Sequence, residues 1–386
     1  MNAKTRFLNA LLHQPVDRPP VAAVVTGITV SMMERAGIYY PDAHSDVNQL
    51  AGLAASIWEY CGIEAIKLPF GMTVEVEVLG MEIDYGTLDT LPTDIVPIWN
   101  DPDELAIPED FLDRCRVPIV LEAISQLRNR YDREVAVLSS IVGPFALSAK
   151  LFGFPNLFPW IITEPDNVHR VMNQLTGLAI QYANAQLDAG ADAILLGEAT
   201  CSGDLISPDT YRDFILPYHK RLCAGIHGPT IMHICGKSSN HLPYIAETGT
   251  TCYSFDEGVD IEMARTHLKG KVAMAGYVPT VEAFVRASQR AWEYTKDHPE
   301  EAAEIFAEKA ELYGFDVPLS LAEIEGSLTL LHTPNSEGKP IGWSAVEDWT
   351  ATQQLLEEFA SFKPEEDINV FFTNDFISEP PYMPAE

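Results

Sequence analysis

A histidine and a cysteine two residues apart, His233 and Cys235, are the side chains whose types and spacing first suggest metal chemistry. They lie in the apolar stretch TIMHICG, residues 230–236, which has the composition of a buried strand. Residues two apart on a strand point to the same face. An imidazole and a thiolate on one face match two protein ligands of a zinc ion. Two ligands do not make a site, and a buried cysteine beside a hydrogen-bonded histidine is also ordinary core sequence.

The next apolar stretch supplies candidates for further oxygen ligands. TCYSFDE ends in two adjacent carboxylates, Asp256 and Glu257. Neighbouring acids at a buried strand end are unfavourable unless a cation or hydrogen bonds compensate, and Zn²⁺ would be such a cation. The start of a solvated loop is the equal alternative. Cys252 lies too far back along the strand to reach the same ion. Cys201 lies in the loop after an earlier strand, from which it could reach a site at the strand ends, but loop cysteines are often incidental.

The elements that must position these residues alternate regularly along the chain. Seven short stretches rich in aliphatic residues predict buried strands. They are residues 20–25, 64–70, 134–143, 191–199, 230–236, 251–257 and 271–278. Amphipathic stretches between them repeat apolar residues every three to four positions, which predicts helices. This alternation favours an α/β fold, a (β/α)8 TIM-like barrel, over a doubly wound sheet, because no GxGxxG follows an early strand.

Sites in such barrels form at the carboxyl ends of the strands. The polar residues that end successive strands are therefore the site candidates. They are Glu198, then His233 and Cys235, then Asp256 and Glu257, then Tyr277.

Charge and composition exclude several classes of function. The chain has 25 basic and 56 acidic residues, a net charge of −31, which repels nucleic acid and anionic membranes. The N-terminus does not read as a signal peptide, and no apolar run is long enough to span a membrane. Six scattered cysteines do not form a disulfide framework. We expect a cytoplasmic protein with reduced thiols.

The rhythm of strands stops at about residue 279. The following residues predict two helices with acidic outer faces and then a stretch rich in tryptophan and proline. We therefore expect a barrel over residues 1–279 and a mainly helical C-terminal segment over residues 280–386.

Longer stretches resemble a known family. TRFLNALLHQPVDRPPVAAVVTGI, GIEAIKLPFGMTVEVEVLGMEIDYG and MHICGKSSNHLPYIAETGTTCYSFDE are among them, and the likeness spans most of residues 4–278. Here the chain resembles the methylcobamide:coenzyme M methyltransferases, the zinc-dependent branch of the uroporphyrinogen decarboxylase superfamily. The resemblance implies that a corrinoid protein delivers the methyl group, carried on a corrinoid as in methylcobalamin, and that a small thiol accepts it.

The same resemblance implies roles for individual residues. His233 and Cys235 correspond to zinc ligands, with Glu257 as a further oxygen ligand. Glu198 matches an acidic position of the family and is expected near the thiol, with structural hydrogen bonding as the equal alternative. Asp256 and Tyr277 are expected in the catalytic pocket on a different ground, because they lie at the ends of the sixth and seventh predicted strands.

The sequence also departs from the family. The family takes its third protein ligand from a cysteine after the eighth strand, but no cysteine follows Cys252. Residues from about 280 resemble instead the C-terminal part of substrate-binding proteins of the nitrate, sulfonate and thiamine-precursor type. The segment DINVFF, residues 367–372, is the candidate for the eighth strand. An open ligand position is left to water, Asp256 or His332, so we expect weakened zinc affinity and low or lost activity.

Three other functions stay open. A uroporphyrinogen decarboxylase needs basic residues for several carboxylates, yet VVTGITV, after the first predicted strand, lacks the arginine of that family. A small-ligand-binding protein would account for the C-terminal likeness. A catalytically inert fusion would have an unclosed barrel with exposed strand edges.

Overall fold

The chain divides into two compact units, Met1–Tyr277 and Val278–Glu386, each described by itself below. The computed structural model describes residues 1–25, 27–256, 258–276, 288–289, 291–309, 316–329, 331–339 and 341–360. The predicted eighth strand, residues 367–372, lies outside these ranges.

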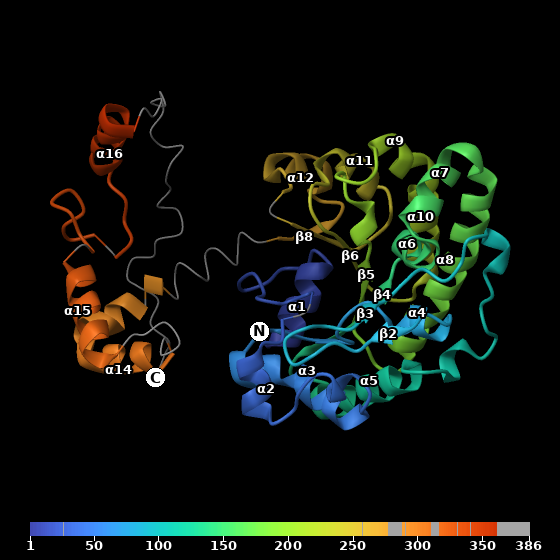
Figure 1. Cartoon of the computed structure of the whole chain (residues 1–386), viewed down its shortest axis with the longest axis horizontal. Helices are drawn as coiled ribbons and strands as arrows, with labels where there is room; N and C mark the ends of the chain where they lie inside the picture. Colours follow the sequence, from blue (N-terminus) through green and yellow to red (C-terminus); the bar gives the residue numbers. More distant parts are fainter. Residues whose placement is uncertain are drawn as a thin grey trace. The chain divides into compact units, whose positions relative to one another are not determined.

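A parallel six-stranded sheet forms the centre of the first unit (Figure 1). Its strands are β1 (Ala65–Leu68), β4 (Ala136–Val142), β5 (Ala193–Gly197), β6 (Thr230–Ile234), β7 (Cys252–Phe255) and β8 (Ala273–Ala275), neighbours in that order. A separate antiparallel pair joins β2 (Ile83–Asp84) to β3 (Thr93–Asp94). Six of the seven predicted strands are thus present, in parallel register.

The prediction of a strand at residues 20–25 is wrong. Its described residues adopt no strand, and one backbone hydrogen bond, from Glu64 N to Val21 O at 2.8 Å, joins the segment to the start of β1. Pro19 and Pro20 lack the N–H groups that a ladder requires. Val24 is nevertheless buried, so the apolar run correctly indicated burial but not hydrogen bonding.

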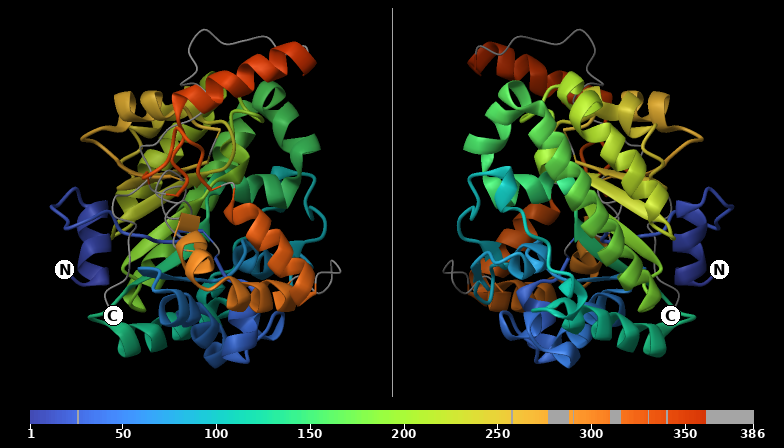
Figure 2. Two further views of the ribbon diagram at one scale, coloured as in Figure 1. Left: turned by 90° about the vertical axis from the view of Figure 1, so that its left-hand side faces the viewer. Right: turned by 90° about the vertical axis from the view of Figure 1, so that its right-hand side faces the viewer.

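Helices surround the sheet in the first unit and make up the second (Figure 2). In the first unit they are α1 (Ala3–Leu11), α2 (Val30–Ala36), α3 (Val47–Cys61), α4 (Val74–Val78), α5 (Val117–Tyr131), α6 (Pro144–Phe152), α7 (Phe154–Thr163), α8 (Pro165–Asp188), α9 (Pro208–Thr210), α10 (Leu216–Gly225), α11 (Leu242–Ile245) and α12 (Ile261–Leu268). In the second they are α14 (Pro299–Lys309), α15 (Val317–Leu328) and α16 (Val346–Ala360). Local sequence explains many ends, such as Asp46 capping the start of α3 and Gly62 its end.

Apolar side chains bury both faces of the sheet. One large cluster lies between the strands and the surrounding helices. A second, smaller cluster takes alternate residues from the other face of the strands. Its strand members are Ala65, Ala136, Leu138, Ala193, Leu195, Ile231 and Cys252. Two cores on opposite faces of one parallel sheet are the packing of a barrel with an inner and an outer layer.

Helix α1 packs on the inner cluster at the amino ends of the strands. Phe7 and Leu11 are buried members of that cluster, and the backbone N–H of Lys4 donates to the carbonyl of Glu134, two residues before β4. The amino end of the inner core is therefore covered, whereas His233 and Cys235 lie at the opposite, carboxyl end of β6.

No single helix in the described part of the chain is long and apolar enough to cross a membrane. Helices α6 and α7 together meet the length and composition requirement, but the chain bends by 114° between them.

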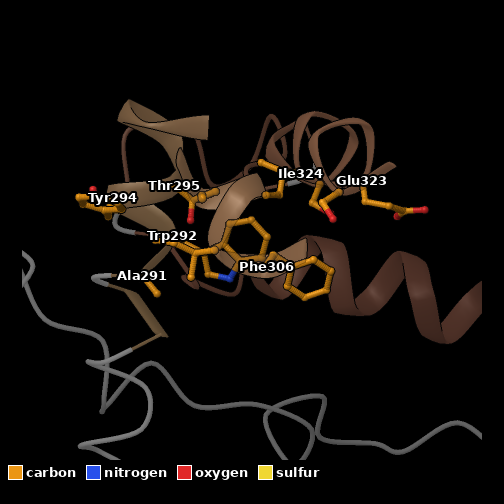
Figure 3. Close-up of a pocket in the computed structure, with 11 residues that line it drawn as sticks. Ala291, Trp292, Tyr294, Thr295, Phe306, Glu323 and Ile324 are labelled. Carbon is orange, nitrogen blue, oxygen red and sulfur yellow. The ribbon is translucent and has the colours of Figure 1, made fainter. Parts of the chain in front are cut away.

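The second unit contains a surface cavity of about 670 Å³ (Figure 3). Its lining comes from helical residues 291–295 and from α14 and α15. Trp292, Phe306 and Ile324 supply apolar surface and Glu323 a charge.

Candidate functional site

His233 and Cys235 lie side by side at the carboxyl end of β6. The Nε2 atom of His233 is 3.1 Å from the Sγ atom of Cys235. His233 is level with Gly197 on β5 and with Ser254 on β7. Leu195 and Cys252, two residues before these on the same strands, belong to the inner cluster, so all of these positions are on the inner face of the sheet. Both candidate ligands therefore face the barrel interior at its mouth.

A hydroxyl orients the histidine. The Oγ atom of Ser254 is 3.1 Å from Nδ1 of His233, on the side of the ring away from Cys235. Metal-binding histidines usually engage their second nitrogen in such a hydrogen bond, which fixes the ring and leaves the other nitrogen for the ion.

Asp256 adds negative charge to this mouth. Its Oδ2 atom accepts a hydrogen bond of 3.0 Å from the backbone N–H of Gly236. Burial lowers the pKa of His233, and the charge of Asp256 opposes that shift. Partial desolvation raises the pKa of the Cys235 thiol, and Asp256 raises it further. Without a cation, the pair is thus a neutral imidazole beside a protonated thiol.

The two remaining residues predicted at this mouth, Glu257 and Tyr277, lie outside the described residues. Among the described residues, no third cysteine, histidine or carboxylate places a ligand atom within 4.8 Å of both His233 Nε2 and Cys235 Sγ. The assignment of Glu257 as a ligand stays a prediction.

Glu198 faces away from this mouth. Because Gly197 shares the inner face with His233, the next residue points outward, between β5 and the helices. Its carboxylate is fully buried and accepts four hydrogen bonds. The donors are the backbone N–H groups of Phe145 (3.3 Å) and Ala146 (2.9 Å), Nε2 of His219 (2.8 Å) and Sγ of Cys201 (3.4 Å).

These contacts make Glu198 a cap for helix α6. Phe145 and Ala146 belong to the first turn of α6, where unpaired N–H groups and the helix dipole attract a negative charge. Gly143 precedes the helix, and a Cβ there would lie only 2.2 Å from Oε1 of Glu198. A structural role, hydrogen bonding that includes the cap of α6, therefore accounts for all the described contacts of Glu198.

Glu198, Cys201 and His219 also form the one group in the described part of the chain that brings three potential metal ligands within 4.8 Å of one another. Each already has a protein partner, and the Tyr211 hydroxyl lies 2.9 Å from the other ring nitrogen of His219. Tyr211 comes from a π-helical turn, Tyr211–Ile215, that lies between α9 and α10.

Sequence reasoning missed Lys67 and Glu75. Lys67 lies on β1, two residues after Ala65 of the inner cluster, and is only 7% exposed. Its Nζ atom donates to the carbonyl of Pro69 at 2.7 Å, so the ammonium points toward the carboxyl end of the barrel. Glu75, on α4, is 3% exposed and accepts a hydrogen bond of 2.7 Å from Val142 N. The sequence does mark Lys67, as the single lysine in the apolar stretch EAIKLPF.

Comparison with known proteins identifies relatives of this architecture. The sequence profile described as uroporphyrinogen decarboxylase (URO-D) matches residues 2–303. The methylated-thiol–coenzyme M methyltransferase of Methanosarcina mazei is 36% identical over 256 residues, which are 66% of this chain and 70% of that protein. The methylcobamide:CoM methyltransferase MtaA of Methanosarcina barkeri is 36% identical over 257 residues, 66% of this chain and 76% of that protein.

More distant and structural comparisons agree. The uroporphyrinogen decarboxylase of Pelobacter propionicus is 29% identical over 302 residues, 72% of this chain and 83% of that protein. A solved structure of a methyltransferase from Methanosarcina mazei superposes with a TM-score of 0.70 at 30% identity, covering 75% of this chain and 88% of the other. None of these findings supports the expected likeness of residues 280–386 to substrate-binding proteins, and the family profile extends 24 residues beyond the predicted boundary at 279. The α/β TIM-barrel fold is thus established, and the chain belongs to the uroporphyrinogen decarboxylase family.

Proposed function

We propose that this protein is a zinc-dependent methyltransferase that moves a methyl group from a methylated corrinoid protein to a small thiol. The observation that carries the proposal is the pairing of His233 Nε2 and Cys235 Sγ, 3.1 Å apart, at the mouth of a barrel of this family. Relatives named for methylcobamide:CoM methyl transfer share a higher identity with the chain than the decarboxylases, 36% against 29%.

The residues present fit a zinc ion. Tetrahedral coordination would place a histidine nitrogen and a cysteine sulfur roughly 3.6 Å apart, so the observed 3.1 Å needs an adjustment of about half an ångström. Ser254 supplies the second-nitrogen hydrogen bond that such a histidine requires. We assign Glu257 as the further oxygen ligand and leave the remaining position to the acceptor.

A bound Zn²⁺ would supply the positive charge that keeps an acceptor thiol ionised at neutral pH. The protein's own residues would orient and desolvate that thiol. His233 and Cys235 fix its position from β6, and Ser254 keeps the imidazole in its orientation. Asp256, whose charge reaches both side chains, is the proposed acceptor of the thiol proton, and Tyr277 is proposed to line the same pocket.

No cysteine follows Cys252 to act as the third protein ligand, which lowers the expected affinity for zinc. A carboxylate ligand contributes less to a zinc site than a thiolate, because zinc prefers nitrogen and sulfur donors. We therefore expect zinc binding that is weaker than in a site with two thiolates, and correspondingly slow methyl transfer.

Metal analysis and methyl transfer together test the proposal. Purified protein, loaded with zinc and then dialysed, should retain zinc, while the His233→Ala variant should retain at least about tenfold less. His227→Ala is the matched control, because His227 is exposed and precedes the opposite end of the same strand. Transfer from methylcobalamin to a thiol should follow zinc content. Equal and sub-stoichiometric zinc in the wild type, in H233A and in H227A would remove the metal site from this account.

A further inference from the structure

The surface cavity of the second unit lies among helical residues 291–295, α14 and α15 (Figure 3). Its volume of about 670 Å³ is within the range of roughly 300–1,000 Å³ that small-molecule sites have. The profile of the uroporphyrinogen decarboxylase family ends at residue 303, before Phe306, Ser320 and Glu323 of the lining. Much of the lining therefore comes from residues outside the family profile.

The lining of this cavity is mainly apolar, and part of it is exposed. Trp292, Phe306 and Ile324 supply apolar surface, and Ile305 extends it. Ile305 is 49% exposed and Phe306 45% exposed, so apolar surface of both residues remains accessible. Exposed apolar surface that gathers in a hollow is typical of a binding site. The ring faces of tryptophan and phenylalanine suit a ligand with a flat, apolar body.

One hydroxyl of the lining is buried without a partner. Ser320 is fully buried, and no described residue hydrogen-bonds with its Oγ atom. A helical serine commonly donates to the carbonyl four residues earlier, as Ser148 does to Pro144 at 2.8 Å. In α15 the backbone N–H of Ser320 donates to the carbonyl of Asp316, but the hydroxyl does not. A buried hydroxyl without a hydrogen bond is unfavourable, so Ser320 indicates a ligand that brings a polar group into the cavity.

The charges around the cavity favour a cation. Glu323 belongs to the lining and has no ion-pair or hydrogen-bond partner among the described residues. Helix α14 has four glutamates and one lysine, and α15 has two glutamates and no basic residue. In the third helical segment Lys296 is paired with Glu293 at 3.6 Å. Because this field repels anions and a tryptophan face attracts cations, the ligand that fits is an organic cation.

Ser320 and Glu323 are close enough to share one group of the ligand. They are three residues apart on α15, and residues at this spacing lie next to each other on one face of a helix. An ammonium group has three N–H donors, so one such group can donate both to the Ser320 hydroxyl and to the Glu323 carboxylate. We propose that the cavity binds a small organic cation whose flat, apolar body contacts Trp292 and Phe306 and whose ammonium group binds Ser320 and Glu323. This inference goes beyond the proposed function and does not depend on it.

Two probes of similar shape and opposite charge give the first test. The amine 2-(1-naphthyl)ethylamine and the acid 3-(1-naphthyl)propionate are titrated against the full-length chain by ligand-observed NMR. Salt at about 0.15 M screens the general negative charge of the protein. A ligand of this size reaches a Kd of about 1 mM or lower at ordinary efficiency, and the amine should bind at least about tenfold more tightly than the acid. Equal affinities for the two probes, or no binding of the amine, overturn the proposal.

Variants of α15 give the second test. Glu323→Gln should weaken binding of the amine about two- to fivefold, the effect of removing an exposed ion pair. Ser320→Ala should weaken it about three- to tenfold, because the ammonium loses a hydrogen bond, yet should not lower the Tm of the ligand-free protein, because the lost hydroxyl was unsatisfied. Glu325→Gln is the matched control: it removes the same charge from an exposed position of the same helix outside the lining. Wild-type affinity in E323Q or in S320A, or an equal loss in E325Q, contradicts the proposal.

Two further variants locate the bound amine. Trp292→Ala removes an aromatic face of the cavity and should weaken binding at least about tenfold. His233→Ala changes only the first unit and should bind the amine as the wild type does. Weaker binding in H233A together with wild-type affinity in W292A would place the probe in the barrel and overturn the proposal. Because the titration uses neither zinc nor a methyl donor, a failure to bind counts against the cavity and not against the proposed methyl transfer.

Discussion

Replacing Glu198 by glutamine tests whether this carboxylate caps a helix or performs chemistry. The substitution keeps the shape of the side chain and removes its charge. In the wild type each carboxylate oxygen accepts two hydrogen bonds, Oε1 from Phe145 N and His219 Nε2 and Oε2 from Ala146 N and Cys201 Sγ. A glutamine retains one acceptor, so its NH2 group must face the donors of one pair.

The expected loss follows from these contacts. One or two charge-assisted hydrogen bonds of about 1.5–3 kcal/mol disappear, together with up to about 1 kcal/mol of interaction with the α6 dipole. We therefore expect E198Q to lose about 3–5 kcal/mol of unfolding free energy, measured by urea denaturation of the purified protein. Folded E198Q protein should retain as much zinc as the wild type.

Glu247→Gln serves as the reference, because its salt bridge to Lys220 is exposed and contributes less than about 1 kcal/mol. A change of less than 1 kcal/mol in E198Q, accompanied by a collapse of methyl transfer, would refute the capping interpretation and restore the catalytic one.

Two further outcomes follow from the same elements. Gly143→Ala places a Cβ 2.2 Å from Oε1 of Glu198 and should lower the unfolding free energy by about 1–3 kcal/mol, measured by urea denaturation. The loss caused by Gly143→Ala should be smaller in a protein that already carries E198Q; equal losses in the two backgrounds would argue against this contact. Glu75→Gln should alter the pH dependence of stability. Burial raises the pKa of Glu75 from 4.5 to about 7, so the stabilisation of its protonated form is complete below pH 4.5 and is lost as pH rises through 7. Urea midpoints at pH 5 and pH 8 should show E75Q gaining up to roughly 3 kcal/mol on the wild type at the higher pH, and parallel profiles for the two proteins would contradict the raised pKa.

The apolar composition of short stretches predicted where most strands lie, because a parallel strand buried on both faces must be aliphatic throughout. The same criterion failed at residues 20–25. Burial there is real, but hydrogen bonding depends on partners that lie elsewhere in the sequence and on the prolines that precede the segment. The π-helical turn Tyr211–Ile215 likewise involves a contact between distant side chains, because the Tyr211 hydroxyl lies 2.9 Å from Nδ1 of His219.

Side-chain direction decided how much of the candidate site the sequence revealed. The two-residue period placed His233 and Cys235 on one face, and their nitrogen and sulfur atoms do lie in contact. The same two-residue period places Glu198 on the outer face, but only when the register of its strand is known, because a shift of one residue reverses the face of every side chain. The sequence alone does not place Lys67, because its position inside the barrel follows only from knowing that Ala65, two residues earlier, faces the inner cluster.

Helix α1 seals the amino end of the barrel with Phe7 and Leu11, and Met1 is exposed beside it. The chain's first residue and the His233–Cys235 pair therefore occupy opposite poles of the first unit. An affinity tag or a tether to a solid support attached before Met1 would hold the protein by its closed pole. Immobilised in this way, the first unit would be held at the end of its sheet opposite to His233 and Cys235.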